Sequence, residues 1–233
     1  STLAVSGGTL DGVTLNGDAT VGSTTLTVRN GLTLNGKLTM SVSTFHNAVN
    51  FEGSQTLDGT GEVFFTGNAI SNGFSNNLNA KGDGGSNPAT LTIGPDITIH
   101  GGASIASYVQ GYYTGDKIVN QGSIVADVSG RTIRVFGPGN QSTGSLKAIN
   151  GGILVLQGSM LNAGSIDIGA GSQVQVVGSL SSDTNSNVRI AIGGTPTSQY
   201  GRITGSGVLH FDGTLNIELV NGFLPSIGNT FSI

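Results

Sequence analysis

Three of the four tyrosines in the chain lie within one short segment, and they form its best candidate for a binding site. The segment 103–116 interrupts an otherwise regular pattern of short apolar runs. The candidate ligand-binding residues in it are Tyr108, Gln110, Tyr112, Tyr113 and Asp116. Aromatic faces stack on sugar rings, and amide or carboxylate groups bind hydroxyls. The segment therefore predicts a glycan-binding loop, with plain coverage of the core as the alternative interpretation of the tyrosines.

The acidic and histidine side chains form no catalytic or metal-binding motif in the sequence. Glycoside cleavage needs two carboxylates at a defined separation, but the ten Asp residues are dispersed, with no D-x-D or D-D pair. His46, His100 and His210 lack a second ligand at metal-binding spacing, and there is no Cys. We therefore predict no catalytic residue, no metal site and no cofactor.

A carbohydrate-active enzyme, either a polysaccharide lyase or a glycoside hydrolase, is the main alternative from another functional class. This alternative requires the fold to bring Asp and Lys or Arg side chains from neighbouring turns into one groove. It fails if no two carboxylates lie within about 10 Å of each other in a shared cleft.

A repeat between Lys117 and Gly178 predicts the kind of strands and turns that would position these side chains. Each copy opens with Gly-Ser before an apolar residue, continues with an alternating run and a glycine-bearing turn, and closes with a second alternating run. The opening glycines of the three copies are Gly122, Gly144 and Gly164, so the spacing between copies is nearly constant. A period of about 20 residues, built from two strands and two turns, is typical of a solenoid.

Composition agrees with an ordered all-β chain. Of 233 residues, 40 are Gly and only 9% are charged, against averages of about 7% and about 25%. Apolar residues alternate with Thr, Ser and Asn, as in strands with one buried face. A looser copy of the repeat occurs earlier, where GVTLNG (12–17) recurs as GLTLNG (31–36). No segment has a helical apolar period, so we expect very little helix.

The pattern predicts one domain with a rod and a cap. Residues 1–192 would form the solenoid, with irregular loops near 71–89 and 103–116, where the pattern fails. Residues 193–233 would form C-terminal capping strands, because an open solenoid end exposes apolar side chains and unpaired strand edges. The residues expected to point into the core are Ile124, Ile133, Leu146, Leu154, Ile166 and Val174.

Several of these segments resemble a known family. NQGSIVADVSG (120–130), SLKAINGGILVLQG (145–158) and NAGSIDIGAGSQVQVVG (162–178) are similar to the Asn-x-Gly-x-Ile repeats of filamentous-haemagglutinin-type and autotransporter-type bacterial surface proteins. The tail from Gly194 onward resembles a terminal segment of the same proteins. The resemblance implies a right-handed parallel β-helix, secreted or on a bacterial cell surface. It implies no particular ligand, and the translocating barrel and N-terminal secretion domain of those families are missing from the sequence.

The leading functional hypothesis is a non-catalytic structural or adhesive segment of a larger secreted or cell-surface bacterial protein. We expect the chain to be a fragment or processed piece of that protein. Its partners would be a polysaccharide or a host or matrix surface. The net charge of −4, with nine scattered basic residues, argues against nucleic acid. No apolar run is long enough to span a membrane, and the oligomeric state stays open.

Overall fold

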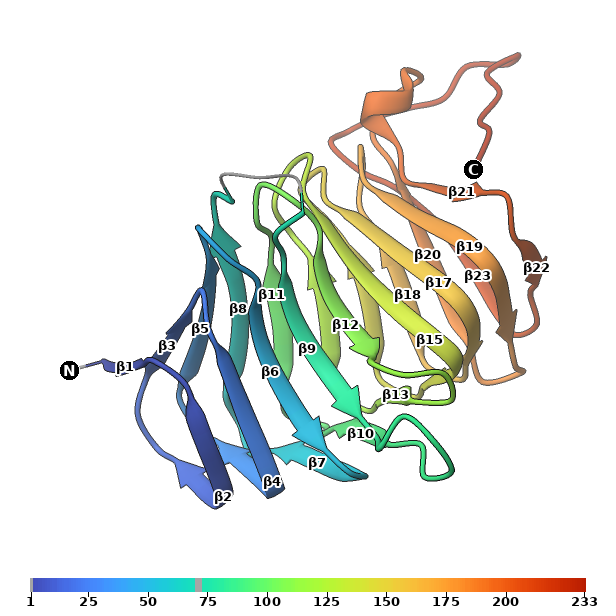
Figure 1. Ribbon diagram of the computed structural model, residues 1–233. Helices are drawn as coiled ribbons and strands as arrows, with labels where there is room; N and C mark the ends of the chain where they lie inside the picture. The colour runs from blue at the N-terminus through green and yellow to red at the C-terminus, as the bar shows by residue number, and fades with distance from the viewer. Residues whose placement is uncertain (1, 70–72) are drawn as a thin grey trace.

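The computed structural model describes residues 2–69 and 73–233, and its regular structure consists almost entirely of parallel β-strands (Figure 1). Within the described residues, helical structure is limited to the single 3₁₀ turn η1 (Thr197–Gln199). The predicted all-β class and low helix content are therefore confirmed. The strands form two sheets that run along the length of the molecule from the N-terminal to the C-terminal end (Figure 1).

The two sheets contain ten and thirteen strands. The order in the first sheet is β1 (Leu3–Val5), β3 (Ala19–Gly22), β5 (Lys37–Val42), β8 (Glu62–Gly67), β11 (Thr98–Gly101), β14 (Ser123–Ala126), β16 (Ser145–Ala148), β18 (Ser165–Ile168), β20 (Asn187–Ile192) and β23 (Thr214–Leu219). The order along the second is β12 (Ser107–Gly111), β9 (Asn76–Lys81), β6 (Asn47–Glu52), β4 (Thr25–Leu34), β7 (Gln55–Asp58), β10 (Thr90–Ile93), β13 (Lys117–Asn120), β15 (Thr132–Ser142), β17 (Ile153–Asn162), β19 (Gln173–Ser182) and β21 (Arg202–Gly205), with β2 (Gly8–Leu15) on β4 and β22 (Val208–His210) on β19.

Strand pairing follows the sequence repeat. Ser145 pairs with Ser165 in the regular repeat, and Val13 pairs with Leu32 in the looser N-terminal copy. In the ten-stranded sheet, the spatial order is also the chain order throughout. The middle of the molecule has longer turns, because Glu62 pairs with Thr98, well beyond one regular repeat. The predicted repeat length thus holds in the N-terminal part and in the regular repeat, but not between them.

Two long strands of the larger sheet, β4 and β15, each pair with two different strands along the same edge. The first half of β4 pairs with β6 and its second half with β7. The first half of β15 pairs with β12 and its second half with β13. Between β4 and β15 the sheet is therefore divided into two ladders, and the pairings close a ring of eight strands, β4-β6-β9-β12-β15-β13-β10-β7. A turn in this region supplies three separate strands, one to each ladder of the ring and one to the ten-stranded sheet.

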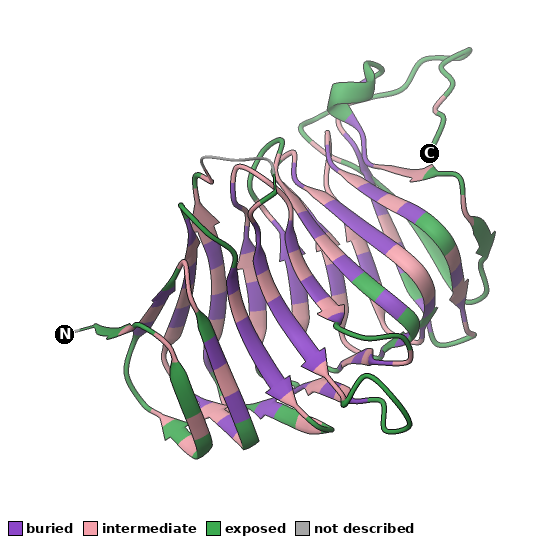
Figure 2. Ribbon diagram, in the orientation of Figure 1, coloured by how far each residue is buried: buried purple, intermediate pink, exposed green. Residues whose placement is uncertain are grey.

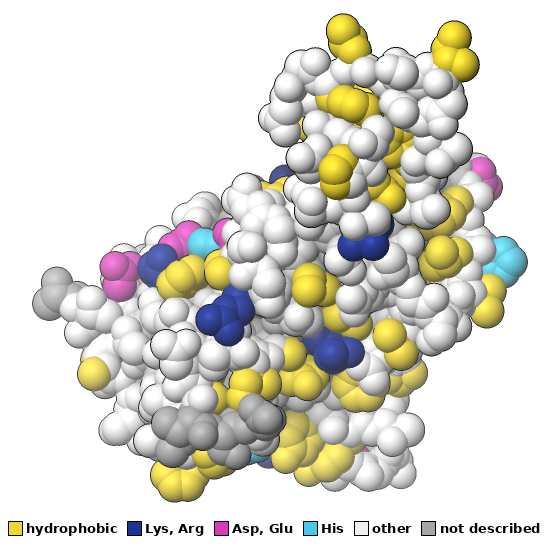
Figure 3. All heavy atoms as spheres, turned by 90° about the horizontal axis from the view of Figure 1, so that it is seen from above, with side chains coloured by type: hydrophobic (Ala, Val, Ile, Leu, Met, Phe, Trp, Pro, Cys, Tyr) yellow, Lys and Arg dark blue, Asp and Glu magenta, His cyan; other side chains and the backbone are white. Residues whose placement is uncertain are grey.

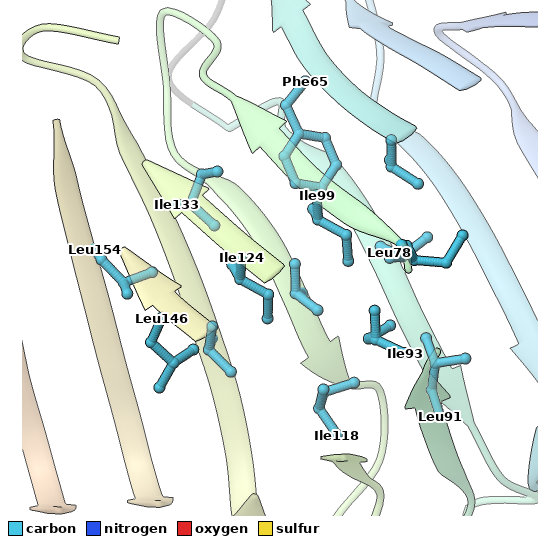
Figure 4. Close-up of a cluster of buried hydrophobic side chains, with 14 of the residues drawn as sticks. Phe65, Leu78, Leu91, Ile93, Ile99, Ile118, Ile124, Ile133, Leu146 and Leu154 are labelled. Carbon is cyan, nitrogen blue, oxygen red and sulfur yellow. The ribbon is translucent and has the colours of Figure 1, made fainter. Parts of the chain in front are cut away.

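Alternation along the strands produces a continuous apolar interior (Figure 2). In β5 and β19, buried residues alternate with partly exposed ones, because successive side chains of a strand point to opposite faces. All six residues predicted to point inward are fully buried. Figure 4 shows Ile124, Leu146 and Leu154 directed into the same interior as Phe65 and Leu91.

The loop predicted near 71–89 is corrected in part. Residues 71 and 72 lie outside the described residues, but β9 occupies the middle of this segment. Its Asn76 and Asn79 are buried and share side-chain hydrogen bonds with Asn47 and Asn50 on β6, at 3.0 and 2.7 Å. A ladder of paired amides satisfies buried polar groups without apolar residues, so the hydrophobic pattern did not reveal this strand.

The loop predicted near 103–116 is also corrected, because β12 lies within it. The inward positions of β12 are Ser107, Val109 and Gly111, all buried. Two of these three residues are small, which left too little apolar content for the alternation to be recognised. Within this segment, irregular structure is confined to the residues before Ser107 and to those between Gly111 and Lys117.

Residues 193–233, predicted to form capping strands of the same domain, continue both sheets at the C-terminal end of the molecule. Strands β21 and β22 pair with β19, and β23 pairs with β20, so these strands form the C-terminal edges of the two sheets. Every residue of β23 is exposed, including Leu215, Ile217 and Leu219, which pair in register with the buried Val188, Ile190 and Ile192. The following tail is irregular, and its Phe231 packs edge-on against Tyr200 with ring centroids 5.4 Å apart.

The interior of β17 provides a direct test of the core. Leu154→Ala should lower the free energy of unfolding by about 2–5 kcal/mol, because it removes a fully buried side chain and leaves a cavity. Leu161→Ala on the same strand is the matched control. Leu161 is 47% exposed, so its loss should change stability by less than about 0.5 kcal/mol. Urea denaturation measures both variants, and equal losses would contradict this assignment of the core.

Candidate functional site

The buried carboxylate of Asp116 holds the segment after β12 in place. Asp116 is fully buried, and its two oxygens accept hydrogen bonds from the backbone N–H groups of Gly82, Ala89 and Tyr113, at 3.0, 2.6 and 2.9 Å. Asp116 therefore ties its own loop to the neighbouring loop between β9 and β10. This burial conflicts with the predicted role of Asp116 in ligand contact.

Tyr112 and Tyr113 lie on the outside of this loop. They are 50% and 39% exposed, and their rings meet edge to face with centroids 4.7 Å apart. The ammonium of Lys81 lies 5.6 Å from the centroid of the Tyr112 ring. These contacts hold the two rings in place while leaving much of their surface in water.

The other two predicted binding residues lie on β12 itself. Tyr108 faces the guanidinium of Arg134 across the sheet, 5.9 Å from ring centroid to guanidinium carbon. Gln110 donates a hydrogen bond to the side-chain oxygen of Asn79, at 3.0 Å. Both are partly buried. Of the five predicted residues, only Tyr112 and Tyr113 line the groove described next.

A groove with a volume of about 660 Å³ lies beside Tyr112. Its lining residues are Gly111, Tyr112, Tyr113, Thr114, Phe136, Gly137, Pro138, Gly158, Ser159, Gly178 and Ser179. Phe136 is 37% exposed and adds a third aromatic ring. The lining includes residues from β12, β15, β17 and β19, which lie side by side on one face (Figure 1). Sequence reasoning missed Phe136, because its place beside Gln110 follows from the pairing of β12 with β15.

Glycines form the floor of this groove. Gly137, Gly158 and Gly178 pair directly with one another on β15, β17 and β19. A Cβ on Gly158 would lie 2.4 Å from the carbonyl oxygen of Gly137, and a Cβ on Gly178 would lie 2.0 Å from that of Gly158. All three also have positive φ, which favours glycine. The backbone thus excludes side chains from this line and leaves it hollow.

A second group of chemistry-bearing residues lies on the outer face of the ten-stranded sheet. The Nδ1 of His100 is 3.0 Å from Asp127 Oδ2, its Nε2 is 3.2 Å from Glu62 Oε2, and Lys37 Nζ is 2.9 Å from Glu62 Oε1. Phe64 packs against this group, with its ring centroid 5.0 Å from that of His100. Figure 3 shows a His side chain next to acidic and basic side chains near one edge of the view.

This charged group borders a shallow hollow of about 440 Å³. Two carboxylates on one imidazole provide groups that can accept and donate protons. Hydrogen bonding from Lys37 holds the pKa of Glu62 below its ordinary value, with charge attraction from Lys37 and His100 in the same direction. Sequence reasoning treated His100 and Asp127 as isolated, because Glu62 and Asp127 are 38 and 27 residues from His100.

A smaller ion-pair group lies further along the same sheet. The Arg189 guanidinium bridges Glu218 and Asp167 on the two neighbouring strands, and these contacts raise the pKa of Arg189 above its ordinary value. Among residues 2–69 and 73–233, no three His, Asp or Glu side chains are arranged to hold a metal ion. The same residues include no helix with the length and hydropathy that crossing a membrane requires.

The ion pair between Glu62 and Lys37 predicts how the stability of the protein depends on pH. Because the folded-state pKa of Glu62 lies below the ordinary 4.5, its contribution to stability is complete above that value and is lost as the pH falls through the folded pKa. Glu62→Gln should therefore be less stable than the wild type at neutral pH, by at most about 1 kcal/mol for a half-exposed pair. Denaturant unfolding at a series of pH values should show this gap shrinking below about pH 4.5. A gap that widens on acidification would contradict the assignment.

Comparisons of the chain with protein-family models, with curated proteins and with solved structures gave no match.

Proposed function

We propose that this chain is a non-catalytic structural and adhesive segment of a larger secreted or cell-surface bacterial protein, and that it adheres through carbohydrate. The observation that carries the adhesive function is the grouping of three exposed aromatic rings, Tyr112, Tyr113 and Phe136, beside a groove. Exposed aromatic residues gathered on a surface mark interaction sites. The rest of the chain supplies a rigid support, since its interior is continuous from turn to turn.

The architecture proposed for this support is a right-handed parallel β-helix. Parallel pairing of each strand with the strand one turn later supports it, and right-handed connections are the strong preference for parallel strands. In this interpretation, the ring of eight pairings arises where the long strands split into two ladders. The Asn-x-Gly-x-Ile motifs at Asn120 and Asn162 support membership of the filamentous-haemagglutinin-type and autotransporter-type surface proteins, and with it the extracellular location.

Retention on insoluble polysaccharide tests adhesion. The wild-type chain should bind one or more of cellulose, chitin, xylan and a bacterial matrix polysaccharide, and Tyr112→Ala should abolish most of that retention because it removes an exposed ring. Tyr108→Ala is the matched control, since Tyr108 lies outside the groove. Failure of the wild-type protein to bind any polysaccharide or matrix surface would refute the adhesive function.

A carbohydrate-active enzyme is the second candidate, and one observation favours it. Glu62 and Asp127 contact the same imidazole at the edge of one hollow, with Lys37 beside them, which meets the requirement for paired carboxylates in a shared site. If this candidate is correct, the wild type should release new chain ends from polysaccharides. Glu62→Gln and Asp127→Asn should each then lower the rate by about 100-fold or more, whereas Asp167→Asn should not. If the wild type releases no new chain ends, that result supports the non-catalytic assignment.

A further inference from the structure

We infer that the groove beside Tyr112 binds a neutral, unbranched polysaccharide that runs along the stack of strands, over Gly137, Gly158 and Gly178. This inference rests on the adhesive function proposed above and specifies its ligand and its orientation. It depends on the groove as a whole, with the aromatic rings at one end and an open floor along the rest.

The direction of the groove follows from the strand register. Tyr112 directly follows β12, which pairs with β15, and β15, β17 and β19 succeed one another in the sheet. Neighbouring strands are about 4.8 Å apart, so the distance from the β12 end to β19 is roughly 14 Å. A ligand in the groove therefore crosses several turns of the protein. An extended polymer fits that path, whereas a compact small molecule would occupy only one end of it.

The chemistry of the lining favours a neutral ligand. Among the described residues that line the groove, none carries a charged side chain, and Asp116 is buried beneath the loop with its carboxylate committed to three backbone N–H groups. An anionic polysaccharide would need basic partners. Lys81, which lies 5.6 Å from the Tyr112 ring centroid, already contacts Glu52 at 3.5 Å.

The polar groups of the groove suit sugar hydroxyls. Ser159 and Ser179 follow Gly158 and Gly178 on the paired strands. The Ser159 hydroxyl oxygen accepts a hydrogen bond from the backbone N–H of Gly139, at 2.6 Å, so its own hydrogen can be donated to a ligand. The exposed faces of Tyr112 and Phe136 can stack on the apolar faces of sugar rings. The floor is a single line of paired glycines, one on each of three neighbouring strands, so it offers a path for one chain, which is why an unbranched polymer is expected.

Affinity electrophoresis in gels that contain a neutral polysaccharide tests the inference. The probes are an unbranched β-glucan, a heavily branched galactomannan and an anionic polygalacturonan, each at a series of concentrations. Wild-type protein should be retarded most strongly by the β-glucan. Tyr112→Ala should raise the dissociation constant about tenfold or more, as loss of one aromatic contact implies.

Ser179→Tyr distinguishes a ligand that follows the glycine line from one held by the aromatic rings alone. The new side chain should obstruct the far end of the groove and weaken binding of the polymer at least tenfold while leaving a short disaccharide unaffected. Ser198→Tyr, at an exposed position outside the groove, is the matched control and should bind as the wild type does. If Ser179→Tyr does not fold, as judged by circular dichroism, Ser179→Leu replaces it.

The results separate this inference from the adhesive function. Wild-type retardation that Ser179→Tyr and Ser179→Leu leave unchanged would overturn the path along the glycines, although adhesion itself would stand. Stronger retardation by polygalacturonan would overturn the neutral ligand. Absence of binding to any carbohydrate or matrix surface would overturn both proposals.

Discussion

Backbone hydrogen bonding between one turn and the next is the constraint on which this structure depends. Strands inside the two sheets pair with a neighbouring strand on each side, so their N–H and C=O groups are all satisfied only if the register is kept throughout. That register places Leu154 against Ile133 on one side and Val174 on the other. The apolar interior is then a consequence of the ladder, because each inward residue lies on the inward residue of the turn before it.

The same pairing decides which residues are tolerated where neighbouring strands approach most closely. Gly158 and Gly178 lie within β17 and β19, and a Cβ at either position would strike the carbonyl oxygen of the glycine on the neighbouring strand. Glycine at these positions is therefore required by close approach between turns. The hollow that results is the floor of the groove, so a property of the backbone creates the surface on which Tyr112 and Phe136 project. On the proposed function, adhesion therefore depends on the close packing of neighbouring strands at these glycines.

Alternation and repeat length were sufficient to predict the all-β class and the inward positions such as Ile124 and Leu146, because apolar residues in strands recur every second position. They were not sufficient for β9 or β12. In β9 the buried positions include Asn76, whose side-chain oxygen accepts a hydrogen bond from Asn47 and whose NH2 group donates one to the Thr66 carbonyl. The apolar alternation does not identify a buried residue that is polar. The grouping of Glu62, His100 and Asp127 was missed for another reason. It depends on the pairing of β11 with β8 and β14, across turns that are longer than the regular repeat.

The exposed C-terminal turn has a consequence for how stability is distributed along the molecule. On the proposed β-helical architecture, each turn contacts only its neighbours, and the free energy of a turn comes largely from the two interfaces it shares. The strand β23 has one such interface, with β20, and its Leu215, Ile217 and Leu219 gain little from burial. Opening should therefore begin there and progress inward as a fraying end, so that amide protons of β21 to β23 exchange with solvent well before those of β15 and β17. The groove reaches this end of the molecule, because Ser179 in its lining pairs with Val208 of β22. Its far end therefore borders the strands that open first, whereas the end with Tyr112 and Phe136 lies on β12 and β15, further inside the sheet.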